Sequence, residues 1–497
     1  MRENNNNIRS VFKATAILSS VQFFNILIGV VRNKIVSMIL GPTGMGVVGL
    51  MQSTSQTISG FTNCGVSVSS VKNVAQAYEN KDISLLGKTI YVLKRLVACA
   101  GSLAILVMLI LSKKLSQWSF GNDDYALSFV CLSISLLFSQ ATQAYQTIIK
   151  GCRRIYYYAR ANVIGNLSAL IISIPLYFIW GEKAIVPVLI LVSLCTCYVA
   201  YLYENRLGIK EIKAEGAEFR AISFDILRMG IPLAISEIFP IMASYLIRLF
   251  VSSGNGGVAD VGLYSAGFAI LNGYVGMIFT AMSSDFIPRL SATVDDNKAC
   301  EGIINNQILL SILILFPILS ILIALCRVVV VLLYSKAFLA MTGMICWGAL
   351  GMLLKTYNWC FGCILIPKRD SKPFFYFSIL SALVYLGTSI AFYSFWGLTG
   401  LGIAFLVSHT WDFIVSVFFV GNRYGIRLSV SLIVKLVLFS LVLVIMIFLT
   451  TVSSSHIYIY IIEALIVLAV SAYSLWSLNR VTNLTDYVKN RFCIRIK

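Results

Sequence analysis

The sequence predicts an all-α polytopic membrane protein with about fourteen transmembrane helices. Of its 497 residues, 58% are hydrophobic and only 12% are charged, whereas a soluble protein carries roughly a quarter charged residues. Many apolar stretches also reach the ~20 residues that a helix needs to cross ~30 Å of hydrocarbon. Because the hydrocarbon offers no hydrogen-bond partner to a peptide group, these stretches are expected to be helices.

Windows of ~19 residues place the spans along the chain. The first six are expected at about 12–40, 44–70, 89–111, 124–149, 157–180 and 184–203. The next six are expected at 226–251, 258–282, 303–333, 338–365, 374–395 and 398–421. Two further spans cover 429–450 and 456–476. The 44–70 segment is the least apolar of them, because it is rich in Ser, Thr, Gln and Gly.

The basic residues test this count. The net charge is +18, and with a cytoplasmic N-terminus nearly all loop Lys and Arg residues fall on the cytoplasmic side. The outer loops hold Lys113, Lys114, Lys183 and Lys336. Cytoplasmic loops of membrane proteins collect Lys and Arg, so both termini are expected in the cytoplasm. The positive charge therefore does not call for a nucleic-acid partner.

An internal repeat indicates two homologous halves. Arg32 corresponds to Arg248, Gly49 to Gly262, and the basic pair ending at Arg154 to the pair ending at 369, all at an offset of about 215 residues. Repeats of this kind are common in transporters. We expect an N-terminal six-helix lobe (1–203), a cytoplasmic linker (204–225), a C-terminal six-helix lobe (226–427), and two accessory helices with a basic cytoplasmic tail (428–497).

Ionisable side chains inside the predicted spans are the candidate functional residues. Each costs ~2.5–3.5 kcal/mol on insertion scales and therefore usually faces a water-filled cavity. The set comprises Arg32, Lys34, Lys94, Arg95, Glu237, Arg248, Lys355, Asp412 and Glu463. Six of these nine are basic, which favours an anionic ligand, and the guanidinium group of arginine suits a phosphate in particular.

Arg32 and Arg248 occupy equivalent positions of the repeat. If the halves face each other across a pseudo-twofold axis, both arginines point into one cleft and clamp a diphosphate, with Lys34, Lys355 and Arg95 in support. The alternative is that both arginines lie near helix ends and extend to the lipid headgroups. Lys94 and Arg95 also allow the interpretation that they belong to a helix end.

Two acidic residues are candidates for ion coupling. Glu237 lies between Pro232 and Pro240, and proline removes a backbone hydrogen bond and kinks a helix. A titratable carboxylate beside a kink suits the coupling of proton or sodium binding to opening. A structural ion pair with Arg248 or another basic residue is the alternative for Glu237, and Asp412 is the second coupling candidate.

The sequence has no pattern typical of an enzyme active site. It lacks a Gly-rich phosphate loop, a metalloprotease helix motif and a nucleophile elbow. Its one Cys-x-x-Cys pair, Cys360 and Cys363, has no second pair, and the chain has two histidines, so we expect no metal centre. We expect a transporter that is not an enzyme and has no cofactor.

Short motifs resemble a known family. Residues 29–35 (GVVRNKI) and 40–46 (LGPTGMG) resemble the opening of bacterial polysaccharide flippases, and 261–266 (VGLYSA) and 287–291 (IPRLS) resemble signatures of that family's eighth span. On these motifs the chain is similar to the Wzx-type O-antigen and capsule flippases of the multidrug/oligosaccharidyl-lipid/polysaccharide exporter superfamily.

The resemblance implies two six-helix lobes around a V-shaped cavity that opens alternately to either face of the bacterial inner membrane. It implies an undecaprenyl-diphosphate-linked oligosaccharide as substrate, on the route to O-antigen and lipopolysaccharide or to capsule. It also implies contacts with membrane lipids, with a polymerase and with other glycan-assembly proteins.

Three alternatives stay open. A lipid II flippase shares the arginine context of Arg32, but an acidic residue commonly follows it there, where this chain has Asn33. A cation-coupled multidrug exporter calls for an acidic, apolar cavity, which the basic bias disfavours. A membrane glycosyltransferase or polymerase calls for a large external loop, and the predicted external loops are short.

Overall fold

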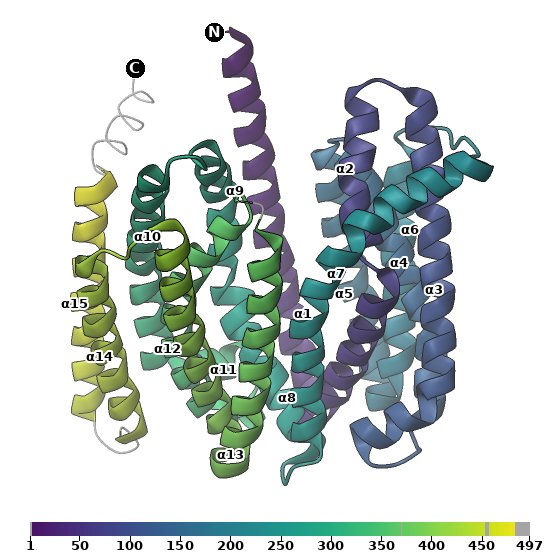
Figure 1. The fold of residues 1–497 in the computed structure, drawn as a ribbon. Helices are drawn as coiled ribbons and strands as arrows, with labels where there is room; N and C mark the ends of the chain where they lie inside the picture. The colour runs from purple at the N-terminus through teal and green to yellow at the C-terminus, as the bar shows by residue number, and fades with distance from the viewer. Residues whose placement is uncertain (1, 369, 453–456, 483–497) are drawn as a thin grey trace, which may run out of the picture. The chain divides into compact units, whose positions relative to one another are not determined.

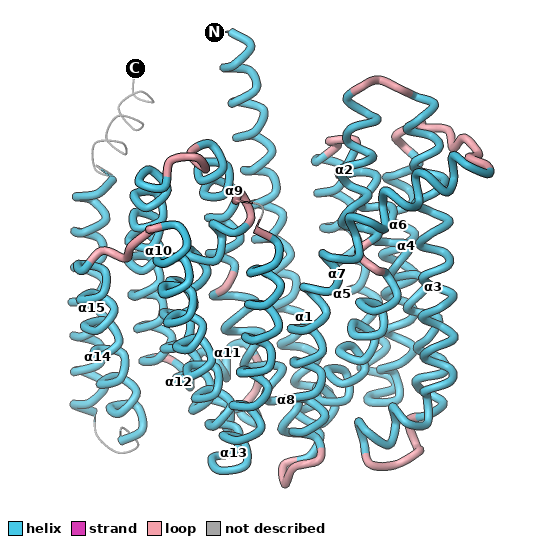
Figure 2. The backbone as a smooth tube through the Cα atoms, in the orientation of Figure 1, coloured by secondary structure: helices cyan, strands magenta, loops and turns pink. Residues whose placement is uncertain are grey.

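The computed structural model describes residues 2–368, 370–452 and 457–482, and within them the chain is helical with short loops (Figures 1 and 2). The first part contains α1 (Arg2–Asn63), α2 (Val66–Glu79), α3 (Ile83–Phe120), α4 (Ala126–Gly151), α5 (Ile155–Trp180), η1 (Gly181–Ala184), α6 (Ile185–Asn205) and α7 (Gly216–Ser252). The second part contains α8 (Gly257–Phe268), η2 (Ala269–Val275), α9 (Met277–Ala292), α10 (Asn297–Ala324), α11 (Cys326–Leu333), η3 (Lys336–Met341), α12 (Thr342–Gly362), η4 (Cys363–Leu365), α13 (Ser371–Tyr424), α14 (Val430–Val452) and α15 (Ile457–Thr482). The predicted all-α class is confirmed.

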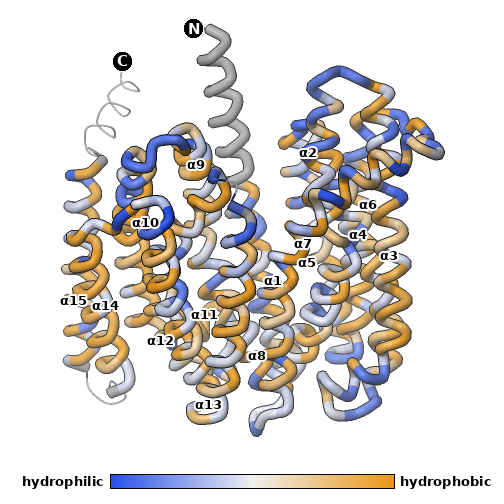
Figure 3. The backbone as a smooth tube through the Cα atoms, in the orientation of Figure 1, coloured by the Kyte–Doolittle hydropathy of each residue, from blue (hydrophilic) through white to orange (hydrophobic). Residues whose placement is uncertain are grey.

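The number of spans also agrees with the prediction. Eleven described segments are long and apolar enough to cross a membrane. One of them contains both α5 and α6, and two others are broken by a glycine with positive φ, Gly41 (φ 64°) in α1 and Gly397 (φ 56°) in α13. An L-residue with a side chain rarely adopts this conformation, so each glycine allows two predicted spans to follow each other almost without a loop. Figure 3 shows hydrophobic residues along the helices and hydrophilic ones at the turns.

The two ends of α13 lie together, which makes this helix a hairpin of two spans. The Tyr424 hydroxyl donates to Asp370 Oδ2 at 2.6 Å, and Arg423 Nε donates to the same oxygen at 2.6 Å. These hydrogen bonds from Tyr424 and Arg423 hold the pKa of Asp370, which lies just outside the span, below its ordinary value.

Several predicted boundaries were wrong. The expected span 44–70 ends at Asn63, because Gly65 takes a left-handed conformation (φ 69°) and α2 starts afresh after it. The expected span 303–333 breaks at Leu325 into α10 and α11, and the expected span 258–282 contains the π-helical turn η2. Hydropathy averaged over a window does not detect such breaks, because it does not register the backbone conformation of a single residue.

The expected linker is helical over more than half its length, since α6 ends at Asn205 and α7 already covers 216–225. Helix α7 begins at Gly216, and its first turns dock through Lys88 Nζ–Glu218 Oε1 (2.8 Å) and Asn73 Nδ2–Asp225 Oδ2 (2.9 Å). The charged residues of 204–225 give this segment a low hydropathy, and a low hydropathy between two apolar spans predicts a linker.

The chain packs into two compact units. Unit 1 comprises residues 1–265, 333–337 and 378–386, and unit 2 comprises 266–332, 338–377 and 387–497. The lobe boundaries expected from the repeat stay a prediction. In unit 1 the core joins α1, α3, α4 and α6 through buried side chains such as Met51, Met108, Phe129 and Val188.

A reciprocal glycine contact joins α7 to the turn between α1 and α2. A Cβ at Gly65 would lie 2.1 Å from Gly230 O, and a Cβ at Gly230 would lie 2.8 Å from Cys64 O. Backbones at this distance leave no room for a side chain on either residue. The contact therefore fixes where the rest of α7 lies relative to α1 and α2.

We expect Gly230→Ala to destabilise the protein by about 1–3 kcal/mol, because the added methyl group overpacks this contact. The measurement is thermal unfolding of the purified protein in detergent. Gly302→Ala in α10 is the control, because a Cβ there meets nothing within 4 Å. Equal unfolding temperatures for the two variants would contradict the assigned packing.

Candidate functional site

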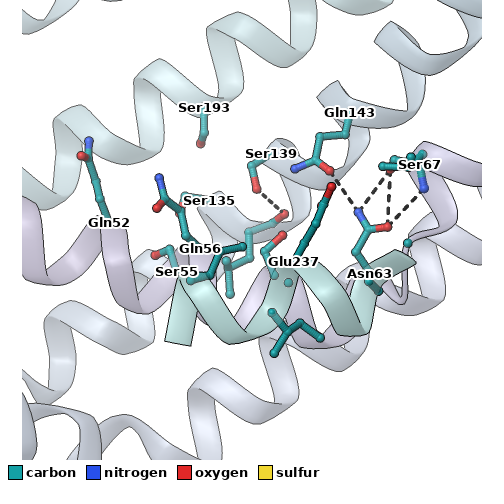
Figure 4. A pocket seen from close by; sticks show the side chains of 18 of the residues that line it. Gln52, Ser55, Gln56, Asn63, Ser67, Ser135, Ser139, Gln143, Ser193 and Glu237 are labelled. Carbon is teal, nitrogen blue, oxygen red and sulfur yellow. Dashed lines mark hydrogen bonds between the residues drawn. The ribbon is translucent and has the colours of Figure 1, made fainter. Parts of the chain in front are cut away.

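A cavity of about 500 Å³ lies inside unit 1, between α1, α2, α4, α6 and α7 (Figure 4). Most of its polar lining is uncharged. These residues are Gln52, Ser55, Gln56, Ser59, Asn63, Ser67, Ser135, Ser139, Gln143 and Ser193. The remaining lining consists of small or aliphatic residues and one carboxylate, that of Glu237.

The second half of α1 supplies one wall. Its lining residues recur every three or four positions from Gln52 to Asn63 and therefore share one face of the helix. The opposite face is packed in the protein, with Leu50, Met51 and Ile58 buried. The segment 44–70 is the least apolar predicted span because one face of its helix is the polar wall of a cavity. The polar residues of this segment recur with a period of about 3.6, and this periodicity is the sequence signal of the wall.

Helix α4 supplies the facing wall through Ser135, Ser139 and Gln143, at intervals of four residues. Asn63 ties this wall to α1 and α2: its Nδ2 donates to Gln143 Oε1 (3.0 Å) and to Ser67 Oγ (3.2 Å), and its Oδ1 accepts from Ser67 N (3.3 Å). Figure 4 shows these bonds beside the cavity. One asparagine therefore links three elements of the site.

Glu237 enters the cavity from α7, about two turns beyond the contact at Gly230. Figure 4 shows its side chain extending toward Gln143. Pro232 and Pro240 flank it within α7, as the sequence indicated. Within the described ranges, no hydrogen bond or ion pair engages the Glu237 carboxylate, so the alternative of a structural pair with Arg248 is not what the structure contains.

The basic residues predicted for the site lie elsewhere. Arg248 is half-buried, and its Nη1 donates to Ser244 O (2.9 Å) and to Ser244 Oγ, while its Nε donates to Ser265 Oγ (3.4 Å). Its guanidinium lies over the Tyr264 ring, 5.1 Å from the centroid. Arg32 is half-buried near the Tyr177 hydroxyl. In the described part of the chain, neither arginine lines the cavity and no contact joins the two, so the diphosphate clamp stays a prediction.

The other two basic candidates of unit 1 have local partners. Lys34 Nζ donates to the Tyr334 carbonyl. Arg95 is exposed and lies over the ring of Tyr91 on its own helix. Its neighbour Lys94 pairs with Glu204 and Glu211 (2.9 and 2.7 Å).

Lys355 and Asp412 both belong to unit 2. Lys355 Nζ donates to Asn272 Oδ1 at 2.7 Å, and Asp412 is only 7% exposed. Beside Asp412 lies His409, whose Nδ1 is 3.4 Å from Asp412 Oδ2. His409 is not among the residues predicted from the sequence, although its spacing of three residues places it on the same helix face as Asp412.

The Asn63 network allows a direct test by a double-mutant cycle. Asn63→Leu removes the bonds to both neighbours and should cost about 2–3 kcal/mol, at ~1 kcal/mol for each bond. Gln143→Met removes one bond and should cost about 1 kcal/mol. In unfolding measurements the double variant should be no less stable than Asn63→Leu. Fully additive losses would show that the Asn63–Gln143 bond does not form.

Comparison with known proteins places the chain in a family. The family model described as polysaccharide biosynthesis protein matches residues 11–294. A curated protein of Escherichia coli (strain K12) called lipid III flippase is 20% identical over 368 residues, which cover 73% of this chain and 86% of that protein.

Solved structures share the fold. The lipid II flippase MurJ in an inward-closed conformation matches with a TM-score of 0.68 at 13% identity, over 93% of this chain and 99% of that chain. An inward-facing multidrug resistance transporter of the MATE family, in the MOP superfamily, matches with a TM-score of 0.65 at 16% identity, over 83% of this chain and 98% of that chain. With its multi-pass helical architecture and the matched residues 11–294, the chain belongs to the polysaccharide biosynthesis protein family.

Proposed function

We propose that this protein is a flippase for an undecaprenyl-diphosphate-linked oligosaccharide, the repeat unit of an O-antigen or a capsule. It would carry this lipid from the cytoplasmic to the outer face of the bacterial inner membrane by alternating access, with both of its termini in the cytoplasm. The observation that carries the proposal is the cavity of amide and hydroxyl side chains inside unit 1.

The chemistry of this cavity suits a sugar. Amide and hydroxyl groups both donate and accept hydrogen bonds, as sugar hydroxyls do. Such groups are costly in a membrane protein unless they have partners, so a polar wall at this position indicates a polar ligand or water. The volume of about 500 Å³ lies within the ~300–1,000 Å³ typical of ligand sites.

The family and one relative support the same class of substrate. The matching family is described by polysaccharide biosynthesis, and the curated relative is called a flippase of lipid III. The outer faces of the helices carry exposed side chains such as Ile110 (78%) and Phe178 (72%), which suit contact with lipid. On this proposal the lipid tail stays in the bilayer while the sugar crosses within the protein.

Charge recognition would then be separate from sugar recognition. The cavity lining includes no Lys or Arg, so the diphosphate would be held by the predicted basic residues: Arg32 and Arg248, with Lys34, Arg95 and Lys355. Glu237, in the cavity, and Asp412, in unit 2, would couple transport to a cation gradient.

One observation favours a second candidate, a cation-coupled multidrug exporter. Glu237 has no ionic partner among the described residues, and a free carboxylate in a cavity attracts cationic compounds. The polar side chains around it do not suit the apolar body of such compounds. Growth with and without the gene in cationic dyes decides this point: increased sensitivity on deletion would favour the exporter.

The test of the flippase is the location of its substrate. In a strain lacking the gene, undecaprenyl-linked oligosaccharides should accumulate on the cytoplasmic face of the membrane, and a plasmid copy should relieve the accumulation. Unchanged surface glycan with no accumulation would refute the proposal.

The cavity wall gives a sharper test in the same strain. Gln52→Leu and Gln56→Leu each remove one hydrogen-bonding group from the wall. Combined in one chain, the two changes should reduce surface glycan about tenfold or more, since each lost bond to a buried sugar is worth about 1 kcal/mol or more. Thr57→Val is the matched control, because Thr57 lies on the same helix but bonds to Ser53 O at 2.8 Å and does not line the cavity. Equal activity of all three variants would exclude the wall from substrate binding.

The diphosphate clamp makes a separate prediction. Arg32→Ala and Arg248→Ala should each abolish export while the protein still inserts in normal amounts, because each removes a positive charge proposed to hold the diphosphate. Arg206→Ala, at the C-terminal end of α6, should export normally. Normal export by both arginine variants would rule the clamp out.

A further inference from the structure

Unit 2 contains a cluster of ionisable side chains that the cavity of unit 1 does not explain. Helix α12 contributes Lys355 and Asn358, the second half of α13 contributes His409 and Asp412, and η2 contributes Asn272. Lys355 Nζ donates to Asn272 Oδ1 (2.7 Å), and Asn358 Nδ2 lies 3.5 Å from Asp412 Oδ2. The cluster thus connects three elements of one unit.

Small residues bring the helices of this cluster close together. A Cβ at Gly402 would lie 2.3 Å from Met344 O, and a Cβ at Gly351 would lie 3.1 Å from the Leu406 backbone. Gly351 is one turn before Lys355 on α12, and Gly402 is two turns before His409 on α13. The glycines therefore place the two polar faces opposite each other. The π-helical turn η2 adds Asn272, and such turns often occur at functional sites.

The surroundings of the cluster are apolar. Phe405 is 4% exposed, its ring lies 4.4 Å from that of His409, and Lys355 Nζ lies 5.8 Å from its centroid. The charged groups that act on His409 are Asp412 and Lys355. Glu463, the other buried acid of unit 2, lies on α15, which packs against α10 and α14.

With His409 neutral, the charges of Lys355 and Asp412 balance. His409 Nδ1 lies 3.4 Å from Asp412 Oδ2 but makes no well-directed hydrogen bond in the described part of the protein. A buried nitrogen without such a bond costs about 1–3 kcal/mol. A proton between His409 Nδ1 and the Asp412 carboxylate would give this nitrogen a charge-assisted hydrogen bond.

We propose that His409 and Asp412 bind one proton, and that Lys355 sets the charge balance of this site. The proposal deepens the flippase function, on which it rests, by naming the coupling ion as a proton. Proton uptake leaves the cluster with one net positive charge, which is unfavourable in apolar packing. It therefore favours a state in which water or an anion reaches the cluster. A metal cation fits this site poorly, since the Lys355 ammonium repels it.

The two histidines of the chain make the test direct. His456→Gln, at a position outside the described residues, leaves His409 as the one imidazole. The protein is labelled with ¹⁵N-histidine, placed in nanodiscs and titrated from about pH 5 to 9 by NMR. The nitrogen signals of His409 should report the uptake of one proton in this range.

Two near-isosteric variants test the assigned neighbours. Asp412→Asn should move the titration midpoint to lower pH by about one unit, because a nearby negative charge favours the charged imidazole. Lys355→Gln should move the midpoint to higher pH, because a nearby positive charge disfavours the charged imidazole. Lys435→Gln, at a half-buried position of α14 outside the cluster, should leave the midpoint unchanged. A histidine that does not titrate, or a midpoint that neither cluster variant moves, would overturn the proposal.

Export in cells separates this proposal from the proposed function. In a flippase coupled through this site, His409→Gln should lose the sensitivity of export to a protonophore. If His409 titrates as expected but no oligosaccharide lipid is exported, the proton site stands and the flippase fails. If export occurs and its protonophore sensitivity is unchanged in His409→Gln, the coupling role is refuted and the flippase stands.

Discussion

The architecture of the candidate site depends on the backbone contact between Gly65 and Gly230. Neither residue has room for a side chain, because each Cβ would fall within 3 Å of the opposing backbone. Gly65 also needs its left-handed conformation (φ 69°) to end the polar helix segment and start α2. The same contact positions α7, so that Glu237 enters the cavity opposite Asn63 and Gln143. One steric constraint thus sets the position of three of the cavity's walls.

The cavity of unit 1 and the buried cluster of unit 2 differ in charge. In unit 1 the cavity presents mainly neutral amides and hydroxyls with one carboxylate, while Arg248 is held by Ser244 and Ser265 at its side. In unit 2, Lys355, His409 and Asp412 form a charged cluster. Neutral hydrogen-bonding groups recognise hydroxyls without the large desolvation cost of a buried charge. A charged cluster in apolar packing instead responds strongly to a single proton.

The sequence predicted the all-α class and the number of spans, because both follow from composition and the length of apolar stretches. It did not predict the breaks at Gly65 and Leu325, since a hydropathy average does not register the backbone conformation of one residue. The candidate residues were selected by charge, a criterion that found Glu237 but not the uncharged wall from Gln52 to Asn63. His409 was not predicted for a similar reason, because its importance comes from its place beside Asp412 and from the nearby charge of Lys355 on another helix. Contacts between distant segments, such as Gly65 with Gly230, leave no signal in a single sequence.

The central claim is that the cavity of unit 1 holds the sugar of a lipid-linked oligosaccharide, and photo-crosslinking in living cells tests it most directly. A benzophenone amino acid at Gln56, whose side chain is exposed in the cavity, should crosslink the intact lipid-linked oligosaccharide, whereas the same group at Thr57 should not. In cells that make the lipid diphosphate without sugar, the Gln56 crosslink should disappear. A crosslink of equal yield to the sugar-free lipid, or none to the oligosaccharide at either position, would contradict the account.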